Sequence, residues 1–306
     1  QMGPRGNLVA SRLVKEADVI LALGTRLGFN STFYSYDNIN REAAIIQVEL
    51  EPTAIGRFFP VDLGIWADAP TAARQITQAL ADKAERSLAE SWTRDFQAER
   101  QAFLAIRDTN AVETHPIQPS GLFKALRGVI PHDAIVTMDA GTLCLQATDA
   151  MNYHTPGSLF TPLDFGLVGF SFACGLGAKL AQPERPVVSL MGDGGFGMTL
   201  SELSTAVDHG INTVTVVMNN GCWGAEKAYQ RDFFNGRYIG ADVSSPPFDQ
   251  VAEMYGGAGF RANALAEVGP AVEAALVCGK PAVVDVAVDP AALYSFRRDS
   301  FKHRGG

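Results

Sequence analysis

The chain has 306 residues, of which 47% are hydrophobic and 19% charged, with 30 glycines and a formal net charge of −8. This length accommodates roughly two domains of about 100–200 residues each, and the apolar content excludes an intrinsically disordered chain. The acidic balance argues against a nucleic-acid partner, because phosphate backbones are bound through clustered cations.

Short apolar runs separated by helical segments make up the first part of the chain. They predict parallel strands at residues 18–24, 44–50 and 63–66, followed by a helix at 71–84. This alternation is typical of an α/β domain with a doubly wound parallel sheet, but such sheets usually have about five or six strands. We therefore expect residues 1–84 to be the C-terminal half of a Rossmann-like middle domain whose first half is absent from this chain.

A charge-laced segment without glycine follows. The apolar side chains of its predicted helix at 87–107 fall near i, i+4 and i+7 positions, which predicts one packing face. They are Leu88, Trp92, Phe96, Phe103 and Ile106. We assign residues 85–116 to a helical linker and place the domain boundary near residue 115.

The second half repeats the alternation of strands and helices. Strands are predicted at residues 134–138, 186–191, 213–218 and 282–287, and helices at 120–128, 169–180, 199–209, 248–255 and 268–277. An open sheet of this kind binds ligands beyond the carboxyl ends of its strands. Within the predicted catalytic domain, residues 117–290, the chemistry is expected just after Met138, Met191 and Met218. Residues 291–306 are assigned to a C-terminal tail.

A glycine-rich turn follows the second of these strands and reads Gly192-Asp193-Gly194-Gly195-Phe196-Gly197. It matches the G-x-G-x-x-G pattern of dinucleotide sites, so an NAD(P)-dependent oxidoreductase is one interpretation. Two features disagree with that interpretation. A carboxylate between the first two glycines would repel a pyrophosphate, and the next strand ends on Asn219-Asn220 instead of the acidic residue that holds a ribose.

A divalent cation between Asp193 and a diphosphate accounts for both features. Mg²⁺ prefers hard oxygen ligands, about one or two from the protein and the others from phosphates. Asn220 lies 27 positions after Asp193, at the end of the next predicted strand. The ends of paired strands lie about 4.8 Å apart, so both side chains can reach one metal ion. The pattern therefore predicts a diphosphate that is anchored through Mg²⁺.

Gly192-Asp193-Gly194, followed after 24 residues by Asn219-Asn220, resembles the cofactor signature of thiamine diphosphate enzymes. The resemblance implies that Mg²⁺ is held by Asp193, Asn220 and the backbone carbonyl of Cys222. The further cofactor contacts that it implies come from Gly141, Thr142, Gly166, Val168, Gly194, Gly195 and Trp223.

The resemblance also gives several of these residues separate roles. It implies that Gly141 and Thr142 touch the diphosphate. Within the segment 165–170, it assigns the Gly166 carbonyl to the 4′-amino group of the pyrimidine ring, and Val168 to the apolar wedge that keeps the cofactor bent.

Residues 17–26 resemble the middle domain of the acetolactate synthase and pyruvate decarboxylase group. Proteins of that group have a pyrimidine-binding domain, a middle domain and a diphosphate-binding domain, in that order. The activating glutamate belongs to the first of these domains. The resemblance therefore implies a partner, namely a pyrimidine-binding domain from a missing N-terminal part or from a second chain, within a homodimer or homotetramer. The alternative is a cofactor-binding subunit or fragment that is inert alone.

Residues 222–237 bear on the reaction. Glu226 lies six positions after Asn220, where decarboxylases of pyruvate and indolepyruvate carry a catalytic glutamate, so the resemblance implies a proton-relay role. A favourable charge near a helix N-terminus explains Glu226 equally well. The segment 223–227 and a tail with Arg297 and Arg298 resemble sulfoacetaldehyde acetyltransferases, which implies sulfite elimination and acetyl transfer to phosphate.

The resemblance to sulfoacetaldehyde acetyltransferases is not complete. Asn219, Gly221 and Cys222 depart from that group's pattern. An acetolactate synthase-like enzyme or a decarboxylase is therefore the alternative, and the substrate is expected to be a small 2-oxo acid or an aldehyde.

Cysteine usage and hydropathy bear on location. The four cysteines are scattered without a C-x-x-C pair, which favours a reducing compartment. The uncharged stretch at residues 165–178 is shorter than the roughly 20 residues of a membrane-spanning helix. We therefore expect a cytoplasmic enzyme without a membrane span.

Overall fold

The computed structural model describes residues 2, 7–81, 88–108, 113–162 and 165–294. The chain divides between Ala105 and Ile106 into two compact units, each with its own hydrophobic core. No helix in the described ranges is long and apolar enough to cross a bilayer.

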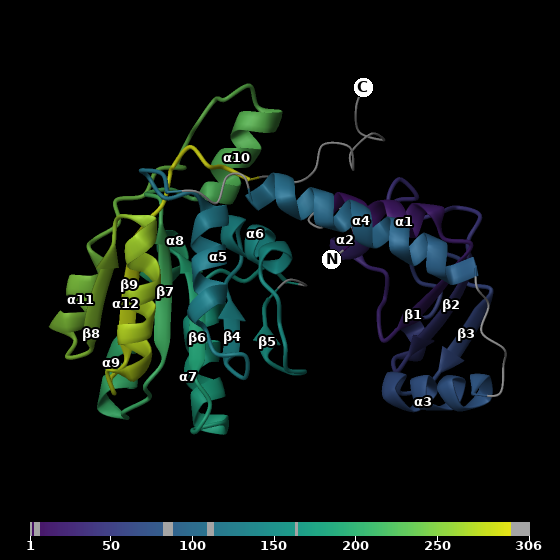
Figure 1. Cartoon of the computed structure of the whole chain (residues 1–306), viewed down its shortest axis with the longest axis horizontal. Coiled ribbons are helices and arrows are strands. Elements are labelled where there is room, and N and C mark those ends of the chain that lie inside the picture. Colours follow the sequence, from purple (N-terminus) through teal and green to yellow (C-terminus); the bar gives the residue numbers. More distant parts are fainter. Residues whose placement is uncertain (1, 3–6, 82–87, 109–112, 163–164, 295–306) are drawn as a thin grey trace. The chain divides into compact units, whose positions relative to one another are not determined.

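The first unit contains a three-stranded parallel sheet in the order β1-β2-β3 (Figure 1). Its elements before the linker are α1 (Leu8–Glu16), β1 (Val19–Leu23), α2 (Phe29–Thr32), β2 (Ala44–Glu49), the 3-10 helix η1 (Pro52–Ala54), β3 (Leu63–Trp66) and α3 (Ala69–Leu80). All three predicted strands are confirmed. The side chains of Asn7 and Asp68 cap α1 and α3 by accepting backbone N–H groups of the first turn.

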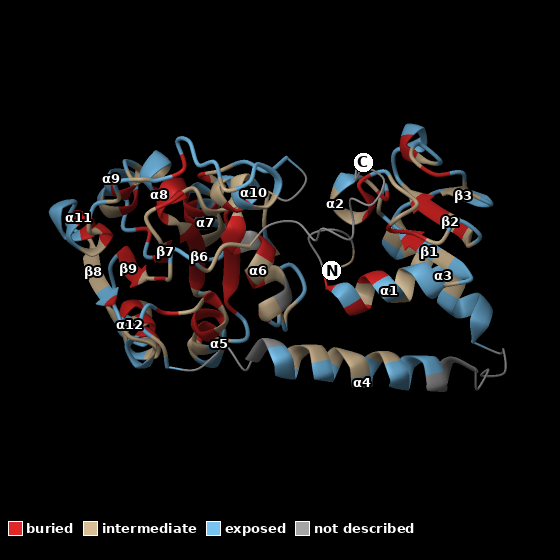
Figure 2. Ribbon diagram, turned by 90° about the horizontal axis from the view of Figure 1, so that it is seen from above, coloured by how far each residue is buried: buried red, intermediate tan, exposed pale blue. Residues whose placement is uncertain are grey.

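Helix α4 (Leu88–Asp108) forms where a helix is predicted, but its apolar stripe does not form a buried face. Trp92 is 42% exposed and Ile106 is 70% exposed, while Phe96 and Phe103 are half-buried. Figure 2 shows no buried residue in the described part of this helix. The prediction of a packing face is therefore wrong for Trp92 and Ile106, which belong to none of the hydrophobic clusters of the described residues.

The second unit is a three-layer α/β structure around a six-stranded parallel sheet in the order β5-β4-β6-β7-β9-β8 (Figure 1). Its strands are β4 (Ile135–Met138), β5 (Leu159–Phe160), β6 (Val187–Gly192), β7 (Val214–Asn219), β8 (Ala258–Ala262) and β9 (Ala282–Ala287). Its helices are α5 (Pro119–Val129), α6 (Thr142–Ala150), α7 (Phe170–Ala181), α8 (Asp193–Thr199), α9 (Glu202–Asp208), α10 (Gly224–Phe233), α11 (Phe248–Met254) and α12 (Leu265–Val277).

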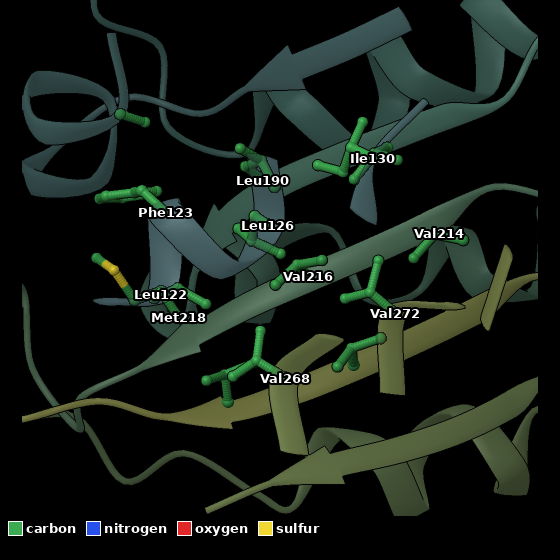
Figure 3. Close-up of a cluster of buried hydrophobic side chains, with 14 of the residues drawn as sticks. Leu122, Phe123, Leu126, Ile130, Leu190, Val214, Val216, Met218, Val268 and Val272 are labelled. Carbon is green, nitrogen blue, oxygen red and sulfur yellow. The ribbon is translucent and has the colours of Figure 1, made fainter. Parts of the chain in front are cut away.

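Two apolar clusters cover the two faces of this sheet. Helices α5, α6 and α12 pack on one face of the sheet. Strand residues such as Leu190 and Val216 contribute to this cluster (Figure 3). Helices α7, α8, α9 and α11 pack on the other face, which receives Met191 and Val217. Both faces are buried, which explains why the strands read as continuous apolar runs.

The structure corrects one predicted helix and adds several elements. The helix expected at 199–209 is two shorter ones, because α8 already begins at Asp193 within the glycine-rich turn and α9 begins at Glu202. The four glycines at 192, 194, 195 and 197 have low helix propensity, so they conceal the start of α8 in the sequence. Strands β5 and β8 and helix α6 are also additions to the prediction.

Candidate active site

The three strands expected to carry the chemistry are neighbours in the sheet. β6 pairs with β4 on one side and with β7 on the other, all parallel, and Gly192 lies opposite Met218. The carboxyl ends of β4, β6 and β7 therefore meet at one edge, as the prediction of a shared site requires. Asp139, Asp193 and Asn220 each follow one of these strands directly.

Asp193 is the buried carboxylate at the centre of this edge, with an exposed fraction of only 2%. It accepts the backbone N–H of Asn220 and a 2.6 Å hydrogen bond from Ser245 Oγ. Burial raises the pKa of Asp193, and these hydrogen bonds oppose the rise. Among the described residues no Lys or Arg forms an ion pair with Asp193, so its negative charge has no cationic partner from that part of the chain.

The loop with the other two predicted metal ligands is held by a segment far along the chain. Trp223 N–H donates to the carbonyl of Ala241, and Val243 N–H donates to the carbonyl of Gly221. Cys222 thus forms an isolated antiparallel bridge with Asp242. Asn220 Oδ1 accepts the N–H of Cys222 at 3.2 Å, which bends the loop back toward the end of β7.

A second polar group lies beside this loop, at the start of α6. Thr142 Oγ1 is buried and has no hydrogen-bond partner among the residues that the structure describes. A Cβ placed on Gly224 would lie 2.9 Å from Thr142 Oγ1 and 3.2 Å from the Asn220 side-chain amide. The N-terminal turns of α6 and α10 therefore converge on one spot, and helix N-termini favour anions.

Chemistry and geometry at this edge fit the predicted cofactor. Asp193 and Asn220 supply a carboxylate oxygen and an amide oxygen, which are hard ligands that suit Mg²⁺. Thr142 Oγ1 lacks the partner that a phosphate oxygen would provide, and buried hydroxyls are normally hydrogen-bonded. Glycine at 224 leaves the space between these groups free of a side chain.

Gly194 and Trp223, both predicted cofactor contacts, also lie against one another. A Cβ on Gly194 would lie 2.7–2.9 Å from three atoms of the Trp223 ring. Gly194 therefore makes room for the indole in this structure.

The Cys222 side chain is buried, and burial raises the pKa of its thiol. A raised pKa lowers the thiolate fraction, which is consistent with a role for the backbone carbonyl of Cys222 instead of its sulfur.

The remaining predicted residues that the structure describes are not joined to this cluster by a hydrogen bond. Glu226 is exposed on the first turn of α10. Gly141 (φ 92°) and Gly166 (φ 76°) both occupy the left-handed half of backbone space that favours glycine, at the turns after β4 and before α7. Arg297 and Arg298 lie outside the described residues.

Three residues of this region are missing from the sequence-based site. Asp139 follows β4 as Asp193 follows β6, so the strand-end rule could have identified it. Gly224 lies in the segment 223–227, and only the three-dimensional structure shows that it leaves space beside Thr142 and Asn220. Ser245 carries no sequence signal, because it lies 52 positions after Asp193 in an irregular segment.

Two family models match the chain. Residues 139–286 match the thiamine pyrophosphate enzyme C-terminal TPP binding domain, and residues 1–76 match the thiamine pyrophosphate enzyme central domain. The first match begins at Asp139 and includes every predicted site residue of the second unit.

Curated relatives point to two enzyme groups. A sulfoacetaldehyde acetyltransferase of Castellaniella defragrans is 32% identical over 98% of this chain and 54% of its own length. An acetolactate synthase large subunit of Mycobacterium tuberculosis is 31% identical over 94% of this chain and 51% of its own length. A probable acetolactate synthase large subunit of Methanococcus aeolicus is 27% identical over 96% of this chain. The chain spans about half the length of these relatives.

Proposed function

Because the chain belongs to the thiamine pyrophosphate enzymes, we propose that its second unit binds thiamine diphosphate and Mg²⁺ at the carboxyl ends of β4, β6 and β7. The observation that carries the proposal is the arrangement at this edge. Within the described ranges, the buried carboxylate of Asp193 has no cationic partner, and the buried hydroxyl of Thr142 has no hydrogen-bond partner.

The roles of the residues follow from their positions. Asp193 and Asn220 would hold Mg²⁺ together with the carbonyl of Cys222, and Thr142 would donate a hydrogen bond to a phosphate oxygen. Thiamine diphosphate, when bound, would supply a carbanion nucleophile and an electron sink for a bond broken next to a carbonyl group. Glu226 would hold or deliver a proton at the reacting carbon, which its place on the first turn of α10 allows.

For the complete enzyme we propose sulfoacetaldehyde acetyltransferase activity, in which sulfite is eliminated and the acetyl group passes to phosphate. The relatives of that name support this choice at 32% and 30% identity over 98% of the chain. An acetolactate synthase-like reaction of pyruvate is the second candidate, supported by relatives at 31% and 27% identity.

A further part of the proposal concerns assembly. We expect a pyrimidine-binding domain, from the same polypeptide or a second chain, to complete the site in a homodimer or homotetramer. The chain alone would then bind cofactor without turnover. Assaying the 306-residue chain with and without that domain tests this; turnover by the chain alone would contradict it.

Cofactor binding is tested by calorimetric titration of the chain with thiamine diphosphate in the presence and absence of Mg²⁺. We expect Mg²⁺-dependent binding that the Asp193→Ala variant loses. Normal binding by this variant would refute the assignment. An absorbance change due to oxidation or reduction of NAD(P)(H) that does not depend on thiamine diphosphate would favour the dinucleotide interpretation.

The substrate is tested with the complete enzyme, supplied with sulfoacetaldehyde, pyruvate or other 2-oxo acids, each with and without phosphate. Acetyl phosphate that forms in the presence of phosphate with sulfoacetaldehyde, and with no other substrate, supports the first candidate. Consumption of pyruvate without a phosphate requirement supports the second. In both cases Glu226→Gln should lower kcat while leaving cofactor affinity unchanged.

A further inference from the structure

Asp139 is a buried carboxylate with no role in the proposed function. It follows β4 directly and is 1% exposed. Its Oδ2 accepts the N–H of Gly169 at 3.0 Å, and its Oδ1 accepts the N–H of Ser171 at 3.2 Å. The N–H of Phe170 also donates to this carboxylate. One side chain therefore binds three successive backbone amides that begin another element.

These amides are the first turn of α7. The N-cap residue Gly169 has φ 86° and provides no side chain to cap the helix. Such N–H groups require an acceptor from elsewhere, and a carboxylate is also the charge that a helix N-terminus favours. Asp139 therefore ties the end of β4 to the loop 166–169, which enters α7.

The carboxylate of Asp139 and the side chain of Val168 both lie close to Gly195. A Cβ on Gly195 would lie 2.1 Å from Asp139 Oδ2 and 3.4 Å from Val168 Cγ1. Gly195 is thus required by the side chain of Asp139, whereas the sequence-based interpretation gave it only a cofactor contact. Val168 is half-buried, and both its side chain and that of Asp139 lie close to Gly195 in α8.

We propose that Asp139 is a positioning residue, which holds the loop 166–169 so that the Val168 side chain keeps one position near the carboxyl end of β6. This rests on the proposed function, in which Val168 supports the organic part of the cofactor while Asp193, Asn220 and Thr142 hold its diphosphate. Among the described residues, Asp139 accepts the N–H groups of Gly169, Phe170 and Ser171, which directly follow Val168, and no hydrogen bond joins it to Asp193, Asn220 or Thr142. Its removal should therefore affect one half of the ligand and spare the other.

The test compares two ligands on the full chain, each with Mg²⁺: thiamine diphosphate and inorganic diphosphate. In Asp139→Asn the amide NH₂ faces a backbone N–H, so one of the two oxygen acceptors is lost. We expect this variant to bind thiamine diphosphate about tenfold more weakly or worse, with affinity for inorganic diphosphate within about twofold of the wild type. Gly195→Ala, which pushes on Asp139 Oδ2, should give the same selective loss and serves if Asp139→Asn does not fold.

Two further variants separate positioning from general destabilisation. Val272→Ala opens a cavity in the core on the opposite face of the sheet, so it should lower the melting temperature and leave both affinities unchanged. Val168→Ala should reproduce the selective loss, and combining it with Asp139→Asn should add little. Equal weakening of both ligands, or unchanged binding of both, would overturn the proposal. Failure of the wild-type chain to bind either ligand would instead overturn the proposed function.

Discussion

Replacing Thr142 by valine should stabilise the cofactor-free protein. The hydroxyl is buried without a partner in the described structure, and such a group costs about 1–3 kcal/mol of folding free energy. Valine keeps the branched shape and the χ1 restriction of threonine, so the change removes mainly the unsatisfied oxygen. Taking the lower end, we expect a gain of about 1 kcal/mol, which corresponds to about 2–4 °C in Tm for a unit of this size.

The same substitution should weaken cofactor binding. A hydrogen bond to a charged group contributes about 1.5–3 kcal/mol, so its loss corresponds to a rise of about 10–150-fold in Kd for thiamine diphosphate. Stability and affinity therefore change in opposite directions. Differential scanning calorimetry of the cofactor-free chain and calorimetric titration with cofactor and Mg²⁺ measure the two effects.

Thr215 provides a matched control. Its hydroxyl is also buried and has no partner in the described part of the chain, but it lies at the amino end of β7, away from the carboxyl ends of the strands. Thr215→Val should raise Tm as Thr142→Val does and leave the Kd unchanged. If Thr142→Val binds cofactor as tightly as the wild type, or if Thr215→Val weakens binding equally, the argument from the unpartnered hydroxyl is refuted.

Three further outcomes follow from the described contacts. Gly175→Ala should destabilise the second unit by about 1–3 kcal/mol, because the new Cβ would lie 2.2 Å from Ser189 Oγ. In the same helix the Cβ of Gly177→Ala meets open space, so this variant should be more stable than the wild type by about 0.5–1 kcal/mol. Urea unfolding measures both changes. Ser245→Ala removes the 2.6 Å donor to Asp193 and should raise the Kd for Mg²⁺ about tenfold by titration, while Ser245→Thr should retain most of the affinity. Burial raises the pKa of Asp193, so the folded chain binds a proton at this carboxyl group more tightly than the unfolded chain does. The stability of the wild type relative to Asp193→Asn should therefore fall as the pH rises from the unfolded pKa through the folded pKa. A stability difference that does not depend on pH would contradict this.

Periodicity and strand-end chemistry account for much of what could be predicted. The runs ending at Met138, Met191 and Met218 are uncharged and mostly apolar, so they identify buried parallel strands without knowledge of their order. Asp193 and Asn220 could be paired because their strands turned out to be neighbours, which the sequence only suggests. The short edge strand β5 has two residues and gives no pattern to detect.

Contacts between distant segments explain most of what the sequence could not predict. The donor to Asp193 comes from Ser245 and the cap of α7 comes from Asp139, and neither relation leaves a periodic trace. The apolar stripe of α4 illustrates the opposite failure, because its spacing is regular while Ile106 remains 70% exposed. Amphipathic spacing predicts a helix, but it does not supply a surface for that helix to cover.

The segment 241–245 belongs to no helix or strand, yet it supports the candidate metal site at several points. It brackets the loop of Cys222 through two backbone hydrogen bonds and reaches Asp193 through Ser245. Local opening of this segment would release two of the predicted ligand positions while the six-stranded sheet stays intact. Metal affinity is therefore governed by a local opening free energy that is smaller than that of global unfolding, and the amides of Trp223 and Val243 should exchange with solvent earlier than those of β6.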